Sequence, residues 1–165
     1  MYTAQYFISR LGMEKHVEGG YFKEIYRSPL LYTAEKKTDD PGEQRNLATT
    51  IYFLLQGEQV SRFHSLKHDE IWFYHYGSSV AIHTISPDGV FETKRLGLAV
   101  EDGQIPQVLI SANDIFAAEN ESKDSFSLVS CLVSPGFDFE DFRMYDGADL
   151  CARFPQHAEI IKRFC

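Results

Sequence analysis

The sequence predicts one domain built mainly of antiparallel β-strands, arranged as a sandwich or a barrel. A chain of 165 residues is long enough for one hydrophobic core, and we expect residues 1–165 to form a single domain. Its 13 Phe and 9 Tyr favour the pleated, half-buried surfaces of strands. Short strand-like segments also follow one another at turn signals without helices between them, a pattern that disfavours a parallel sheet with crossover helices.

The first and last predicted elements are short helices. Residues 3–11 place Tyr6 and Phe7 on an apolar side, and Gly12 ends this helix. Residues 155–164 open with a proline and form the closing amphipathic helix. Between the helices we predict strands over 21–27, 48–55, 61–63, 70–75, 80–85, 90–96, 107–111 and 126–133, and a polar loop over 33–46.

Composition disfavours several classes of partner. A net charge of −8 argues against nucleic acid, because affinity for phosphate backbones comes from clustered Lys and Arg. No apolar run approaches the roughly 20 residues that span a bilayer, and the N-terminus lacks the basic start and apolar core of a signal peptide. Cys131, Cys151 and Cys165 form no C-x-x-C pair, which favours reduced thiols. We therefore expect a cytoplasmic protein that binds neither nucleic acid nor a membrane.

The segment from Gly57 to Gly77 contains the densest group of chemically active side chains. His64 ends one predicted strand and Glu70 opens the next, and strand alternation places Trp72 and Tyr74 on the same face as Glu70. If this face points inward, these side chains line one cavity. An imidazole beside a carboxylate can bind a metal or transfer a proton. Burying Glu70 also requires a partner, for which His64, Arg62 or a ligand would serve.

The same segment resembles the first motif of the cupins, which runs Gly, five residues, His-x-His, three or four residues, Glu, six residues, Gly. Gly57, His64, Glu70 and Gly77 follow this frame with one extra residue after Gly57. The wider chain resembles the DUF985 or Cupin_5 subfamily. This resemblance includes His16-Val17-Glu18-Gly19-Gly20, Thr49-Thr50-Ile51-Tyr52-Phe53-Leu54-Leu55, Asp69-Glu70-Ile71-Trp72 and Pro135-Gly136-Phe137-Asp138-Phe139-Glu140-Asp141-Phe142. It implies an RmlC-like jelly-roll barrel, usually as a homodimer, and no settled reaction.

The pattern of metal-binding cupins is incomplete in this chain. Leu66 stands at the second His position of the first motif, and Ala117 stands where the second motif, Pro-x-Gly-x-x-His, ends in His. His68 is expected in a turn and His75 on the opposite strand face. We therefore expect no cofactor and no tightly bound metal, with a weak divalent ion at His64 and Glu70 as the alternative.

Roles follow for the candidate residues. We expect His64 to act as a base and Tyr74 as an acid, and we expect five further residues to contact the substrate: Glu70, Trp72, Arg62, Arg45 and Glu24. Glu24 and Arg27 form either a structural ion pair or polar pocket groups. His16 and Glu18 are expected in local capping or in a dimer contact, whereas Asp138 and Asp141 are expected in solvent.

The leading functional hypothesis is a pocket for a small polar metabolite, such as a sugar or a nucleotide-sugar. Its enzyme form is a metal-independent epimerase or isomerase that removes a proton beside a carbonyl, and Arg27, Arg45 and Arg62 are the candidates to bind a diphosphate. The alternatives are a metal-dependent cupin enzyme, namely a dioxygenase or an isomerase, and a non-catalytic small-molecule-binding module. We also expect a homodimer or a multiple of dimers, because the strand at 21–27 would otherwise leave an exposed edge.

Overall fold

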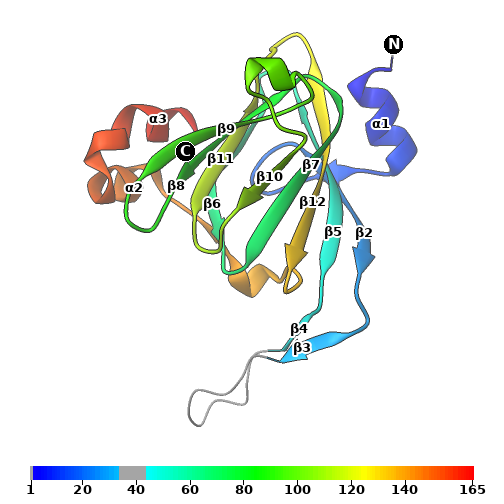
Figure 1. The fold of residues 1–165 in the computed structure, drawn as a ribbon, viewed down its shortest axis with the longest axis horizontal. Helices are drawn as coiled ribbons and strands as arrows, with labels where there is room; N and C mark the ends of the chain where they lie inside the picture. Colours follow the sequence, from blue (N-terminus) through cyan, green and yellow to red (C-terminus); the bar gives the residue numbers. More distant parts are fainter. Residues whose placement is uncertain (1, 34–43) are drawn as a thin grey trace.

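Two antiparallel sheets pack face to face and form the body of the molecule (Figure 1). The structure is a computed structural model that describes residues 2–33 and 44–165. The central apolar cluster joins side chains of both sheets: Phe53 and Trp72 from the first contact Ile82 and Phe116 from the second. Burial of these apolar surfaces stabilises the packing of one sheet on the other. The predicted jelly-roll architecture with antiparallel strands is confirmed.

The first sheet supplies most of the side chains that concern function. Its strands in spatial order are β1 (Glu14–Lys15), β2 (Tyr21–Arg27), β5 (Thr49–Gln56), β12 (Phe126–Ser134), β7 (Asp69–Gly77) and β10 (Gln107–Ile110). Aromatic and β-branched residues dominate β5, as expected for a strand with a buried face, and β12 alternates apolar residues with serines over part of its length.

The second sheet covers the inner face of the first. Its strands in spatial order are β13 (Phe142–Met144), β6 (Val60–Leu66), β11 (Ile115–Asn120), β8 (Val80–Ile85) and β9 (Phe91–Leu96). A separate ribbon of β3 (Leu31–Thr33) and β4 (Gln44–Asn46) projects away from the sheets (Figure 1). The ends of the loop predicted over 33–46 are therefore strands, and the rest of that loop lies outside the described residues.

Strand β11 is missing from the sequence prediction. It lies between β6 and β8, and both of its faces are buried against other elements. A strand that is covered on both sides loses the alternation of apolar and polar residues by which half-buried strands are identified. Strand β6 is also longer than the predicted 61–63, and its extension carries His64 and Leu66.

The N-terminal helix α1 (Ala4–Leu11) confirms the prediction. Thr3 caps it by accepting a hydrogen bond from the Tyr6 amide, and Gly12 ends it at φ +62°. The helical segment predicted over 155–164 is also present, as a 3-10 turn that leads into an α-helix, but the helix before it was not predicted. That region contains η3 (Pro155–His157) and α3 (Ala158–Arg163), preceded by α2 (Gly147–Arg153). Two further 3-10 turns are η1 (Val100–Asp102) and η2 (Phe139–Asp141). No helix in the described ranges is long and apolar enough to cross a membrane.

Candidate functional site

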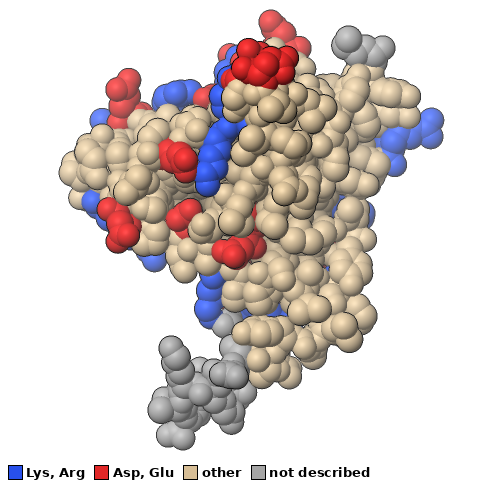
Figure 2. Space-filling view, viewed as in Figure 1, with Lys and Arg blue, Asp and Glu red and all other residues tan. Residues whose placement is uncertain are grey.

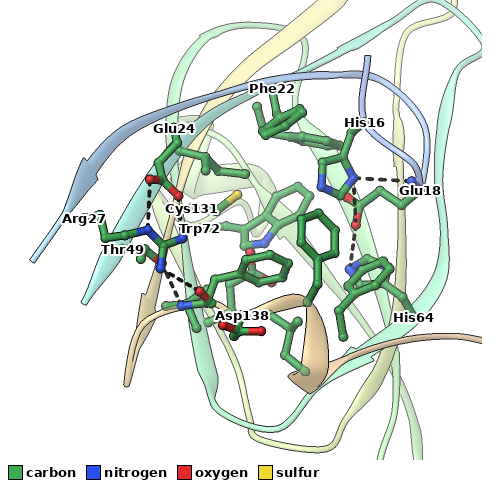
Figure 3. Close-up of a pocket in the computed structure, with 18 residues that line it drawn as sticks. His16, Glu18, Phe22, Glu24, Arg27, Thr49, His64, Trp72, Cys131 and Asp138 are labelled. Atoms are coloured by element: carbon green, nitrogen blue, oxygen red, sulfur yellow. Dashed lines mark hydrogen bonds and ion pairs between the residues drawn. The ribbon is translucent and has the colours of Figure 1, made fainter. Parts of the chain in front are cut away.

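A cavity of about 240 Å³ lies inside one end of the sandwich (Figure 3). Strands β2, β5, β7 and β12 form one side of it and β6 forms part of the other. The turn that holds His16 and Glu18 closes one edge, and the segment 137–142 closes another. Its aromatic lining is formed by Phe22, Phe53, Trp72, Phe137, Phe139 and Phe142. Such a cavity is typical of small-molecule sites, which combine apolar walls with a few polar groups.

Four of the predicted site residues line this cavity. They are Glu24, His64, Glu70 and Trp72. His64 is 2% exposed, Glu70 7% and Trp72 1%, so the strand alternation inferred from the sequence placed these side chains on the correct face. Their chemical roles stay predictions.

Glu18 contacts His64 at the closed side of the cavity (Figure 3). His64 Nδ1 lies 2.7 Å from the Arg62 carbonyl oxygen, which can only accept, so Nδ1 carries the hydrogen. His64 Nε2 then faces Glu18 Oε2 at 3.0 Å. The Ser61 hydroxyl donates to Glu18 Oε1 at 2.9 Å. The carboxyl group and the imidazole are therefore fixed in position for proton transfer between them.

Burial determines whether Glu18 or His64 carries the proton that lies between them. Burial lowers the pKa of His64 to about 4, against an opposing effect of the Arg62 carbonyl. Burial raises the pKa of Glu18 to about 7, while His16, Ser61 and Arg62 lower it. Below about pH 7 the shared proton consequently resides on Glu18, and His64 is neutral. A proton donor or acceptor that titrates near neutrality suits general acid–base chemistry.

His16 has the local capping role that the sequence suggested, but both His16 and Glu18 also line the cavity, which the sequence analysis did not predict. The Glu18 amide donates to His16 Nδ1 at 3.3 Å, and burial lowers the pKa of His16. Gly19 explains the position of the turn. Its φ is +121°, and a Cβ there would lie 2.0 Å from the Val60 carbonyl oxygen, so only glycine allows the turn to pack this closely on β6.

Glu70 is buried without the protein partner that the sequence suggested. His64 pairs with Glu18 instead, and Glu70 Oε2 makes no hydrogen bond to any described residue. Burial and, to a smaller extent, the Glu18 carboxyl raise the pKa of Glu70 to about 8, against the opposing effect of the nearby Trp72 and Cys131 side chains. Despite this proximity, Trp72 Nε1 also lacks a hydrogen-bond partner of normal geometry in the described chain.

Three predicted site residues do not line the cavity. Tyr74 points to the correct side of β7 but lies about 13 Å along the strand from Glu70, and its hydroxyl donates to the Gly77 carbonyl. The Arg62 guanidinium donates to the Val17 carbonyl at 2.7 Å. These two side chains therefore support the fold around the cavity and do not form its lining.

Arg45 is the third predicted site residue that does not line the cavity. It lies on β4 of the β3–β4 ribbon and binds the segment 137–142 that closes the cavity. Its guanidinium donates to both carboxylate oxygens of Asp141, at 2.7 and 3.1 Å, and to Glu140 at 3.2 Å. The Asp141 side chain is buried by this contact, so its expected position in solvent is wrong. Bidentate contacts of this kind fix geometry as well as charge.

Arg27 holds the same segment from β2 and also lines the cavity. It donates to the Phe137 carbonyl at 3.0 Å and to Asn46 at 2.8 Å, and it forms a two-point contact with Glu24 at 2.7 and 3.1 Å (Figure 3). Both alternatives for Glu24 and Arg27 therefore hold, because they are an ion pair and pocket groups at once. Asp138 lines the cavity beside them.

The described residues do not match the ligand set of a metal-binding cupin. Leu66 lines the cavity at the second His position, and Phe116 on β11 packs its ring 4.0 Å from the His64 ring. Ala117 packs on the opposite side of β11, among residues of the C-terminal helices. Within 2–33 and 44–165, no group of three His, Cys, Asp or Glu side chains is arranged to hold a metal ion.

Comparison with known proteins agrees with this architecture. The family model described as Cupin superfamily (DUF985), Cupin_5, matches residues 5–145. The chain belongs to the Cupin_5 family. An uncharacterised protein of Saccharomyces cerevisiae is 32% identical over 156 residues, which cover 89% of this chain and 77% of the yeast protein. The Cupin_5 assignment thus confirms the resemblance deduced from the motifs.

Solved structures of other proteins have the same fold as this chain. A Shewanella oneidensis protein is 41% identical with a TM-score of 0.88, covering 99% of this chain and 98% of that one. A hypothetical protein from Leishmania major is 35% identical with a TM-score of 0.90, covering 99% of both chains. Oxalate decarboxylase of Bacillus subtilis is 11% identical with a TM-score of 0.55 over 92% of this chain and 37% of its own, which shows similarity of fold alone.

Burial of Glu70 predicts a measurable dependence of stability on pH. A carboxyl group whose pKa rises from 4.5 to about 8 on folding holds its proton more tightly in the folded state. Between pH 6.5 and 8 the unfolded protein has already lost this proton, so stability falls as the pH rises, by about 2 kcal/mol from this group. Glu70→Gln should remove that part of the slope, as urea unfolding at the two pH values can show.

The matched control for this measurement is Glu119→Gln. Glu119 lies outside the cavity lining, and its pKa is lowered although its partial burial acts in the opposite direction. It is ionised throughout this pH range in both states, so the control should retain the wild-type slope. Equal slopes for wild type and Glu70→Gln would contradict the prediction.

Proposed function

We propose that the cavity binds a small organic molecule and transfers a proton on it without a metal ion, as an isomerase or an epimerase does. The observation that supports this is the 3.0 Å contact between Glu18 Oε2 and His64 Nε2 inside an apolar cavity. Removing a proton from carbon beside a carbonyl requires a base that titrates near the working pH. The ionised Glu18 is such a base, and His64 is placed to receive the proton from it or to return one.

The surrounding residues would assist this step in two ways. The Arg62 carbonyl and the Ser61 hydroxyl hold the pair in one orientation, so little reorganisation is required when the proton moves. The aromatic walls, with the closing segment 137–142, would keep water away from the reacting carbon. Trp72 lies between the proton-transfer pair and the Arg27 side of the cavity (Figure 3).

The arrangement favours a substrate without phosphate groups. A nucleotide-sugar would need cationic side chains for its diphosphate, and Arg45 and Arg62 lie outside the cavity lining. Arg27 reaches the cavity but donates to Glu24, Asn46 and the Phe137 carbonyl. We therefore narrow the substrate class to small metabolites without phosphate.

The proposal is tested by exchange of carbon-bound hydrogen for deuterium. Protein treated with a chelator would be incubated in D₂O with the small molecule that it retains on purification, identified by native mass spectrometry, and the loss of C–H signal followed by NMR. Exchange that persists without metal supports the proposal. Exchange that requires added iron, manganese or nickel would favour a metal-dependent enzyme, and binding without exchange would favour a non-catalytic module.

We further propose that the protein forms a homodimer through the free edge of β2. In the described chain, β1 pairs with β2 only at Tyr21 and Phe22, and the rest of that edge is open. Ile25 and Tyr26 are exposed there, and the surface over β2 and the β3–β4 ribbon in Figure 2 carries few charged side chains. Unpaired edges of this kind favour strand pairing with a second copy.

Sedimentation velocity at micromolar concentration is expected to show a dimer. Tyr26→Asp should shift it toward the monomer, whereas Val90→Asp, at an exposed position beside β9, should not. A monomeric wild-type protein, or equal effects of both variants, would contradict this interface.

A further inference from the structure

The cavity has an excess of acidic side chains. Of the described residues that line it, Glu18, Glu24, Glu70 and Asp138 carry carboxyl groups, and Arg27 carries the one guanidinium. Arg27 is engaged by Glu24, so it offsets little of the charge seen by a ligand at the opposite side. The two histidines, His16 and His64, have lowered pKa values because they are buried, and they add no positive charge at neutral pH.

Glu70 is the acidic group that most requires a partner. It is 93% buried, since its exposed fraction is 7%, and Oε2 has no hydrogen bond within the described chain although it belongs to the cavity wall. A buried carboxylate without a counter-charge is strongly unfavourable, whereas a paired one is tolerated. His64, the protein partner that the sequence suggested, is already paired with Glu18, and the nearby Trp72 and Cys131 side chains carry no positive charge. A cationic group on a ligand would supply the counter-charge that the ionised form of Glu70 lacks.

The walls around Glu70 indicate the chemistry of that partner. Neutral hydrogen-bonding groups are scarce in the lining, and the Thr49 hydroxyl already accepts from the Phe137 amide at 2.9 Å. The polar groups of the lining are therefore mostly acidic, and an ionised carboxylate can only accept hydrogen bonds. Aromatic rings are plentiful, and the Trp72 and Phe53 rings pack edge to face at 5.5 Å. The faces of such rings attract cations, most strongly when water is excluded.

We propose that the ligand of this cavity carries a positively charged ammonium group, which Glu70 binds among the aromatic walls. This rests on the proposed function, because it assigns a chemical class to the small molecule that Glu18 and His64 act upon. The ligand is thus an amine with a compact apolar body, and the amine is its anchor rather than its reacting centre. Electrostatic attraction between the ammonium group and Glu70 replaces the counter-ion that the protein lacks.

Three probes of equal size and different charge test the inference: n-butylammonium, n-butanol and butyrate, each titrated by calorimetry at pH 8. The wild-type protein should bind butylammonium at least about tenfold more tightly than butanol, and butyrate more weakly than either. Glu70→Gln should abolish the preference for butylammonium over butanol. Glu119→Gln, which changes an acidic residue outside the cavity lining, should retain it.

The pH dependence provides a second readout. An alkylammonium stays charged below about pH 10, so its binding follows the ionisation of Glu70, which titrates at about pH 8. Affinity for butylammonium should fall as the pH is lowered from 8 to 6, by up to about tenfold per unit, while affinity for butanol stays constant.

Equal or tighter binding of butanol, or no binding of butylammonium at millimolar concentration, would overturn the ammonium inference. Neither result would affect the proposed proton transfer, which is tested separately by deuterium exchange and by substitution of Glu18. Loss of exchange with a preserved preference for butylammonium would reject the proposed function instead.

Discussion

Glu18→Gln is expected to slow deuterium exchange on the bound ligand by roughly 10²–10⁴-fold, the usual effect of losing a general base. Glutamine has the same shape as glutamate and can preserve both contacts of the site. Its amide can donate to His64 Nε2, and its carbonyl can accept from the Ser61 hydroxyl. The substitution therefore removes the transferable proton while the geometry stays in place.

The wild-type rate should also increase as the pH rises through about 7, because the ionised form of Glu18 is the base. His64→Gln should cause a comparable loss of exchange, since it removes the other member of the pair. His83→Gln is the matched control. His83 is also buried and also contacts a glutamate, Glu119, but neither residue lines the cavity. A variant of Glu18 that exchanges at the wild-type rate would exclude the proposed role.

Phe116→Ala is expected to lower the free energy of unfolding by about 3–5 kcal/mol, the range measured for such truncations in packed cores. Phe116 is fully buried on the central strand β11. Its ring contacts the His64 ring at 4.0 Å and the Trp72 ring at 6.3 Å, so it supports the back of the cavity. Truncation would leave a void between the two sheets that the neighbouring side chains cannot fill.

Phe139→Ala provides the comparison for this measurement. Phe139 is 62% exposed, and the same truncation there should change the free energy of unfolding by no more than about 0.5 kcal/mol. Urea unfolding of both variants at one pH gives the two values. A loss below about 1 kcal/mol for Phe116→Ala would show that the two sheets do not pack on this ring as described.

Local patterns in the sequence were sufficient to predict part of the candidate site. Strand alternation identified Glu70 and Trp72, and the motif around Gly57 identified His64, because a short turn joins the consecutive strands β6 and β7. These strands are not paired with each other but lie in the two opposite sheets that enclose the cavity. Tyr74 lies outside the cavity lining, and strand alternation cannot reveal this. Period two gives the face of a strand but not the depth at which the cavity ends.

The rest of the candidate site depends on contacts between residues that are far apart in the sequence. Ser61 and Glu18 are 43 residues apart, and Arg45 and Asp141 are 96 apart. No local pattern predicts which of several acidic residues reaches a given partner over such separations. The signal that could have identified Glu18 was the pair of glycines after it, since adjacent glycines permit a turn to lie directly against another strand.

Because Gly19 packs closely on β6, the part of the chain that positions Glu18 and His64 is different from the segment 137–142 that closes the cavity. The backbone of β6 fixes the proton-transfer pair, through the Arg62 amide that donates to the Glu18 carbonyl at 3.0 Å. The segment 137–142 instead contributes Phe137, Asp138, Phe139 and Phe142 to the cavity lining, and it is held in place by contacts of the Arg27 and Arg45 side chains. Substitutions in that segment can therefore alter which molecule is accepted without disturbing the acid–base geometry. Such a scaffold is suited to acquiring new substrates by few mutations, both in natural divergence and in directed evolution.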